Sequence, residues 1–271
     1  MTDLPTAPDT IPSRLGIHLD VDADGALIGQ LRAPEAICER GVVPMAALVL
    51  LVDIVGGVSV DTDPDTWLFT SDLTVRAPAV PAPAAIDCAT RLLRGGRRST
   101  VAEAPLSVGG ERWAHSYIGF SRVERRPTDP PKPMPDLERI GERISLPPIE
   151  EPIRRAAGFR SDDGASGRVV ADLRPQLLNP AGAMQGAVVA ALAEAAAEDF
   201  ADHHRMLGER PHVVTEIEMR FLAQNRVSPI ATRARNTGAP GEGLVLVDLV
   251  DDGGRGRVTT SALCRMRPSP G

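Results

Sequence analysis

Aromatic residues and long apolar runs are both scarce in this sequence. Five Phe, two Trp and one Tyr make up 3% of the 271 residues, so a core has to be built from Ala, Val, Leu and Ile. The hydrophobic fraction of 42% is large enough to supply one. The longest apolar run, residues 46–52, ends at Asp53 and is far shorter than the ~20 residues that span a bilayer. The composition therefore favours a soluble globular protein and predicts no membrane span.

The sequence also lacks an excess of basic charge and a disulfide framework. Its net charge of −6 disfavours a nucleic-acid partner, because such a surface needs a basic stripe. The three cysteines, Cys38, Cys88 and Cys264, are far apart and odd in number, so they match neither a set of disulfides nor metal-ligand spacing. Residues 1–12 show no basic segment followed by an apolar one, as a secretory signal would. We expect reduced thiols and a cytoplasmic location.

Proline, by contrast, is concentrated in one part of the chain. Eight of the 25 prolines fall within residues 127–152, which we interpret as a linker with a short helix around residues 137–143. The chain is also longer than the ~100–200 residues of a typical single domain. We therefore predict an N-terminal domain over residues 13–126 and a C-terminal domain over residues 153–271.

A repeat links these two domains. Residues 41–53 align with residues 182–194 at an offset of 141 positions, and residues 71–76 align with residues 215–220 at an offset of 144. Each half reads as strand, one long helix and then a run of antiparallel strands. The predicted helices cover residues 44–58 and 184–203. The first of them is apolar nearly all round, so a curved sheet has to cover it.

Turn signals between the apolar segments divide the predicted strands. In the first half we expect a hairpin over residues 15–31 and strands at 67–76, 84–93, 99–108 and 112–123. In the second half we expect strands at 167–173, 212–222, 230–236, 243–251 and 257–267.

The second half carries a recognisable combination of motifs. It reads Asn-Pro-Ala-Gly-Ala-Met-Gln-Gly over residues 179–186, then an Ala-rich helix with an acid at Glu194, then Val-Thr-Glu-Ile-Glu-Met-Arg-Phe-Leu over residues 214–222. This combination resembles the hotdog-fold acyl-CoA thioesterases, in particular the phenylacetate-pathway and 4-hydroxybenzoyl-CoA thioesterase branch. The resemblance covers most of residues 155–267 and extends more weakly to residues 15–123. It implies an α+β double hotdog, with two antiparallel sheets each wrapped around one long helix.

The start of the second helix is the candidate oxyanion hole. Where the thioesterase branch commonly has His-Gly-Gly, this chain has Gln185, Gly186 and Ala187. Backbone N–H groups at a helix start are unpaired and carry partial positive charge, and a glycine there lets a thioester oxygen approach closely. Gly186, flanked by Gln185, is therefore expected to polarise the carbonyl. The alternative is that Gly186 only permits tight packing of helix on sheet.

Two acids, Asp53 and Glu194, interrupt the apolar helices at equivalent positions. An acid in such a place is expected to have a raised pKa and to act as a general base or as a nucleophile. The alternative for each is an ordinary partnered helix acid. Ser71 and Thr215 lie on matched strands and are suited to binding the acid or a water, unless they are ordinary strand residues. Asn179 is suited to holding a water or the carbonyl, or else to Asn-Pro turn chemistry.

The two acids cannot serve the helix starts of their own helices. The eight positions from Gly186 to Glu194 rise about 12 Å along a helix. The resemblance likewise implies that the acid comes from the opposite half, so two half-sites are expected. The first joins a polar helix start to an acid and a hydroxyl of the other half: Asn179, Gln185, Gly186, Asp53 and Ser71. The second is a degenerate copy: Cys38, Pro44, Met45, Glu194 and Thr215. We expect the first to be the working site.

The predicted function is hydrolysis of an acyl-CoA to free acid and CoA, without a metal or redox cofactor. One alternative is a non-catalytic acyl-CoA-binding or regulatory double-hotdog protein. Another is an acyl-CoA hydratase or dehydratase. Two fused halves already equal one hotdog dimer, and related proteins often pair such dimers, so we expect a homodimer of this chain.

Overall fold

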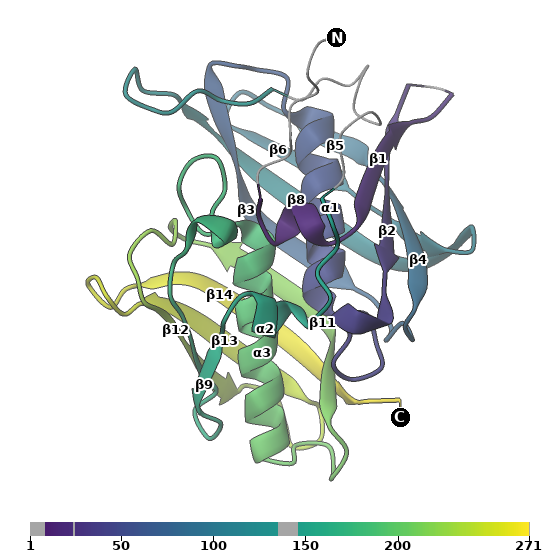
Figure 1. Cartoon of the computed structure of the whole chain (residues 1–271), viewed down its shortest axis with the longest axis vertical. Helices are drawn as coiled ribbons and strands as arrows, with labels where there is room; N and C mark the ends of the chain where they lie inside the picture. The colour runs from purple at the N-terminus through teal and green to yellow at the C-terminus, as the bar shows by residue number, and fades with distance from the viewer. Residues whose placement is uncertain (1–8, 24, 135–145, 271) are drawn as a thin grey trace.

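Two long helices lie against one large antiparallel sheet in the computed structural model (Figure 1). The structure describes residues 9–23, 25–134 and 146–270. Helix α1 covers Met45–Val60 and helix α3 covers Gly186–His203, close to the predicted ranges. Shorter helical segments are η1 (Pro12–Arg14), η2 (Glu35–Ile37), α2 (Ile153–Ala156) and η4 (Pro175–Leu177). Within these described residues, no helix is long and apolar enough to cross a membrane.

Fourteen strands of the described part of the chain form the sheet. The strands before the proline-rich segment are β1 (Ile17–Val21), β2 (Leu27–Ala33), β3 (Thr66–Arg76), β4 (Ala84–Ala89), β5 (Arg91–Gly95), β6 (Ser99–Glu103), β7 (Leu106–Val108) and β8 (Glu111–Glu124). Those after it are β9 (Arg160–Asp163), β10 (Arg168–Ala171), β11 (His212–Phe221), β12 (Ile230–Asn236), β13 (Leu244–Asp251) and β14 (Val258–Pro268).

Two of the predicted strands are split in the structure, and one observed strand was not predicted. The segment 99–108 is split into β6 and β7, because Pro105 between them has no N–H to donate to the ladder. The segment 84–93 is also split, since β4 pairs with β2 and β7 whereas β5 pairs with β6. The hairpin partner β9 was not expected. All four of its residues are exposed, so it shows no alternation of apolar and polar positions.

The strands on the two sides of the sheet's centre follow equivalent orders. The order β1-β2-β4-β7-β8-β3 on one side continues as β11-β14-β13-β12-β10-β9 on the other. At the centre Thr74 of β3 pairs with Glu218 of β11, and these two residues are separated by the repeat offset of 144 positions. Each therefore pairs with its own counterpart, so a pseudo-twofold axis passes between them.

Matching irregularities occur in β3 and β11. The register of β3 against β8 shifts between Thr70 and Asp72, and the register of β11 against β14 shifts between Val214 and Glu216. The two positions are again 144 residues apart. A β-bulge of this kind turns a side chain away from its regular direction. The bulge in β3 lies next to the cavity described below.

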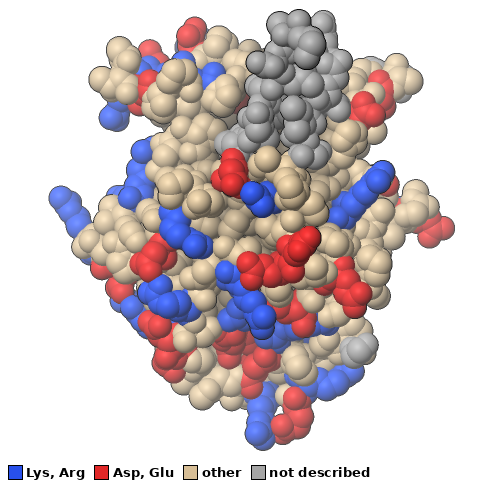
Figure 2. Space-filling view, viewed as in Figure 1, with Lys and Arg blue, Asp and Glu red and all other residues tan. Residues whose placement is uncertain are grey.

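Helices α1 and α3 pack antiparallel, and the start of each lies beside the middle of the other. Small and aliphatic side chains fill the core around them, as the scarcity of aromatics requires. On the face seen in Figure 2, acidic and basic side chains are interspersed rather than gathered into a field of one sign.

The first part of the proline-rich segment packs against the N-terminal half. We call residues 125–134 the strap. The Lys132 side chain is only 3% exposed, and its ammonium donates to the Asp61 carboxylate at 2.5 Å and to the backbone oxygens of Asp63 and Thr66. Trp67 donates from Nε1 to the Asp129 carboxylate at 3.0 Å. The strap is therefore fixed to the fold by its own side chains. The helix expected around residues 137–143 lies outside the described residues.

Candidate active site

Asp53 stands at the edge of a cavity of about 880 Å³ between the two halves of the chain. It is half-buried in the middle of α1. One carboxylate oxygen, Oδ1, accepts a hydrogen bond of 2.6 Å from the hydroxyl of Thr70. The other, Oδ2, lies 3.5 Å from the side-chain amide nitrogen of Gln185, which belongs to the opposite half. The structure thus brings Asp53 together with the start of α3, as the spacing argument predicted.

The hydroxyl beside Asp53 is that of Thr70 and not the predicted Ser71. Ser71 instead donates to the Asp72 carboxylate at 2.8 Å, although it too lines the cavity. The bulge between Thr70 and Asp72 turns the threonine towards α1. Regular alternation along the strand does not reveal this exchange, so the prediction was wrong by one residue. The equivalent of Thr70 in the other half is Val214, which has no hydroxyl.

The start of α3 presents a free backbone donor to the cavity. Gln185 caps the helix, because its side-chain oxygen accepts a bond of 2.7 Å from the N–H of Ala187. Within the described part of the chain, the N–H of Gly186 has no hydrogen-bond acceptor. A Cβ atom built on Gly186 would lie 3.2 Å from Asp53 Oδ2. The glycine therefore allows the carboxylate to approach the helix start closely.

Asn179 organises the turn that leads into α3. Its side-chain oxygen accepts hydrogen bonds of 3.0 Å from the N–H groups of Ala181 and Ala183. Gly182 in the same turn has a φ of +75°, a conformation that favours glycine. Both oxygen contacts follow the turn chemistry that was the alternative interpretation of this residue. Asn179 also lines the cavity.

Burial raises the pKa of Asp53 above its ordinary value of 3.8, and the hydrogen bond from Thr70 partly opposes that shift. A carboxylate with a raised pKa is a stronger base towards water.

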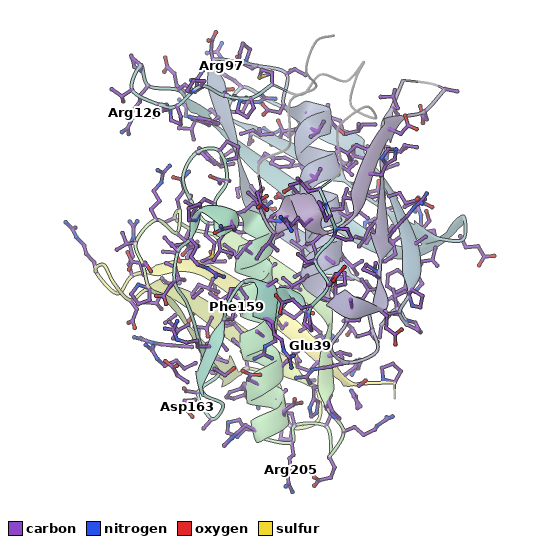
Figure 3. All side chains as sticks on the ribbon, in the orientation of Figure 1. Glu39, Arg97, Arg126, Phe159, Asp163 and Arg205 are labelled. Carbon is purple, nitrogen blue, oxygen red and sulfur yellow. The ribbon has the colours of Figure 1, made fainter. Side chains whose placement is uncertain are left out.

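The scarce aromatic residues gather around this acid. Four of the eight in the chain line the same cavity: Trp67, Phe69, Phe120 and Phe221. The strap closes one side of it, and Arg126 of the strap lies at the outer edge of the molecule (Figure 3).

The second half-site is closed. The Glu194 carboxylate accepts hydrogen bonds from the N–H groups of Met45 at 2.7 Å and Ala46 at 2.9 Å, so it occupies the start of α1. The cavity at this place is about 40 Å³. Burial raises the pKa of Glu194 to about 7, although the two N–H groups and Arg40 oppose the shift. The raised pKa expected for a helix acid is therefore found at both Asp53 and Glu194.

Ion pairs fill the space around Glu194. Arg40 contacts the Glu198 carboxylate at 3.2 Å and the Asp202 carboxylate at 2.8 Å. Burial holds the pKa of Glu198 well above its usual range. Arg154 also lines this small cavity and lies 3.8 Å from Glu39, which Figure 3 places beside α3 at the centre of the molecule.

Of the remaining residues of the predicted second half-site, Pro44 lines the small cavity with Glu194, whereas Thr215 and Cys38 form their hydrogen bonds elsewhere. Thr215 donates its hydroxyl to the backbone oxygen of Arg265 at 3.4 Å, and the Cys38 thiol donates to the backbone oxygen of Pro34 at 3.5 Å. Pro44 precedes the first residue of α1 and provides no side-chain cap. Among the described residues, no group of His, Cys, Asp and Glu is arranged to hold a metal ion.

The fold matches solved thioesterase structures. No protein-family model and no curated protein matches the sequence. An acyl-ACP thioesterase from Bacteroides thetaiotaomicron superposes with a TM-score of 0.58 at 11% identity, covering 89% of this chain and 97% of that one. The tesB protein of Mycobacterium avium subsp. paratuberculosis has a TM-score of 0.59 at 12% identity, covering 93% and 96%. A 12:0-ACP thioesterase from Umbellularia californica has a TM-score of 0.56 at 10% identity, covering 89% and 96%. At these identities the likeness establishes the α+β fold that this chain shares with thioesterases.

Proposed function

We propose that this chain is an acyl-CoA thioesterase of double-hotdog architecture with one working site. The two hotdog units would be residues 13–126 and 153–271, joined by residues 127–152. One observation carries the proposal: Asp53 and Thr70 of one half meet Gln185 and Gly186 of the other at the edge of an open cavity. Thioester hydrolysis needs a base for water and a donor for the carbonyl oxygen, and this pairing supplies both.

In the proposed reaction the thioester carbonyl oxygen accepts a hydrogen bond from the unpaired N–H of Gly186. The positive end of the α3 dipole at this place stabilises the developing oxyanion. Asp53 takes a proton from a water molecule, and the resulting hydroxide adds to the carbonyl carbon. The C–S bond then breaks, and Asp53 returns its proton to the departing CoA thiolate. The acyl group leaves as a carboxylic acid. Thr70 holds Asp53 in position by donating to the oxygen that does not face Gly186.

Asp53 also has the geometry of a direct nucleophile, which would form an anhydride that water then hydrolyses. A single turnover in isotopically labelled water distinguishes the two routes. The general-base route places labelled oxygen in the released acid. In the direct route, attack of water on the Asp53 carbonyl carbon of the anhydride places it in the Asp53 side chain, so label found there identifies this route.

The proposed function is tested by measuring release of free thiol from a panel of acyl-CoA thioesters. Turnover of at least one class of acyl-CoA is expected. Tight binding of the panel without thiol release would favour the non-catalytic alternative instead. Addition of water to an unsaturated acyl-CoA without thiol release would favour a hydratase.

A further inference from the structure

Two residues of α1 and the residue that caps its C-terminal end form one stripe along the cavity. Asp53, Gly57 and Asp61 are spaced four positions apart, which places them on one face of the helix, and all three line the cavity. The repeat offset of 141 maps them onto Glu194, Glu198 and Asp202 of α3. The middle position therefore holds a glycine beside the open cavity and a glutamate beside the closed one.

The glycine is not required by packing. A Cβ atom on Gly57 would find its nearest neighbour, Cε1 of Phe120, at 3.9 Å, which is an ordinary contact. On the adjacent Gly56 a Cβ would lie 3.0 Å from Cγ2 of Ile118, so that glycine is needed for close packing against the sheet. A glycine inside a helix costs about 1 kcal/mol relative to alanine. At Gly57 the absence of a side chain leaves space in the cavity beside Asp53, at that cost in helix stability.

The far end of the stripe is closed by charge. Asp61 is paired with Lys132, whose three N–H groups all have oxygen acceptors. The pair therefore forms a polar wall that an apolar chain end does not displace. The eight positions from Asp53 to Asp61 rise about 12 Å, a length suited to an acyl chain of medium length.

We propose that the acyl chain lies along α1 over Gly57, and that Gly57 is the residue that sets how long a chain the site accepts. The chain would start at the carbonyl beside Asp53 and Gly186, pass over Gly57 on its cavity side with Phe120 alongside, and end before the Asp61–Lys132 pair. This inference rests on the proposed function, because it assigns the acyl end of the same substrate.

The fluorescence of Trp67 reports whether an acyl chain occupies the cavity. Trp67 lines the cavity, and the chain has only two tryptophans, so a Trp113→Phe background leaves Trp67 as the sole tryptophan. The probes are saturated fatty acids of increasing length, each brominated at its terminal carbon to quench the tryptophan on contact. The variants are Gly57→Ala, Gly57→Leu and the control Val58→Leu, which adds bulk on the neighbouring residue outside the cavity lining. Thiol release from saturated acyl-CoAs of the same lengths is measured in parallel.

In the unsubstituted protein, quenching should strengthen with chain length up to a medium chain. Gly57→Leu should shift the optimum to shorter chains, with about a fourfold loss of affinity for each methylene that is displaced. Gly57→Ala should give a smaller shift of the same sign, and Val58→Leu should keep the original profile. An unchanged profile in both folded Gly57 variants would overturn the inference while leaving thiol release intact. Absence of both thiol release and quenching in the unsubstituted protein would instead overturn the proposed function.

Discussion

The Glu194 carboxylate accepts a hydrogen bond of 2.7 Å from the backbone N–H of Met45, the first residue of α1. Its counterpart Asp53 faces the start of α3 but leaves the N–H of Gly186 without an acceptor among the described residues. One acid thus fills the helix start that it faces, and the other leaves it open to a ligand. The longer side chain of glutamate allows its carboxylate to reach the N–H groups at the start of α1. Met45 stands there in place of a glycine and narrows the space beside this helix start further.

This difference predicts that only one acid is catalytic. Asp53→Asn should reduce turnover by roughly 10²-fold or more, because the base for water is lost. Glu194→Gln should leave turnover within about tenfold, since its partners are backbone groups of a closed site. Both are assayed by thiol release, with folding checked by circular dichroism. Near-normal turnover in Asp53→Asn together with an inactive Glu194→Gln would reverse the assignment.

The acid limb of the pH profile should report Asp53. Its carboxylate must be ionised to accept a proton, so kcat/KM should fall as the pH falls through its raised pKa. Thr70→Val removes the hydrogen bond that lowers this pKa, so the acid limb should move to higher pH. Ser71→Ala is the matched control, because Ser71 bonds Asp72 instead. Identical profiles for Thr70→Val and the unsubstituted protein would remove Thr70 from the site.

Glu194 should make stability depend on pH in the opposite sense to a typical carboxylate. Its pKa is raised from 4.5 to about 7 in the folded protein, so its contribution is fully present below pH 4.5 and is lost as the pH rises through about 7. Urea unfolding across this range compares the protein with Glu194→Gln, which does not titrate. The free energy of unfolding of the unsubstituted protein should fall relative to the variant as the pH rises. A constant difference would show that Glu194 does not titrate in this window.

Gly186→Ala should impair catalysis without unfolding the protein. The added Cβ would lie 3.2 Å from Asp53 Oδ2, so the carboxylate has to shift by a few tenths of an ångström. Displacement of a reacting group in a positioned site costs up to about 10²-fold in rate, so a loss between about tenfold and that limit is expected. Steady-state kinetics and thermal unfolding are compared with those of the unsubstituted protein. Unchanged rates in Gly186→Ala would argue against close approach at the helix start.

A homodimer is still expected, and the exposed strand β5 is the surface on which to test it. Among the described strands it pairs with β6 alone, and its two leucines, Leu92 and Leu93, are 55% and 44% exposed. An exposed apolar edge of this kind favours association with another strand. Light scattering should give the mass of two chains, and Leu92→Lys combined with Leu93→Lys should give the mass of one. A monomer at micromolar concentration in the unsubstituted protein would contradict the prediction.

Local periodicity and the internal repeat were sufficient to predict much of this protein. Apolar residues recur with the periods of helix and strand, and these periods are local properties, so α1, α3 and most strands lie within a few residues of their predicted ranges. The rise of a helix also predicted that Gly186 must meet an acid from the opposite half. That deduction needed only a fixed geometry and an aligned repeat.

Contacts between distant parts of the chain decided the rest. The bulge that turns Thr70 instead of Ser71 towards Asp53 depends on the pairing of β3 with β8, and the residues of β3 by themselves do not predict it. The strap was predicted as a linker because proline composition is local, whereas burial of Lys132 depends on oxygens about 70 residues earlier in the chain. Whether a helix acid faces an open cavity or caps a helix start depends on a few ångströms of side-chain length and on what surrounds it. The sequence by itself therefore determined most of the elements and the pairing of the halves, and the tertiary structure decided which helix start remains open.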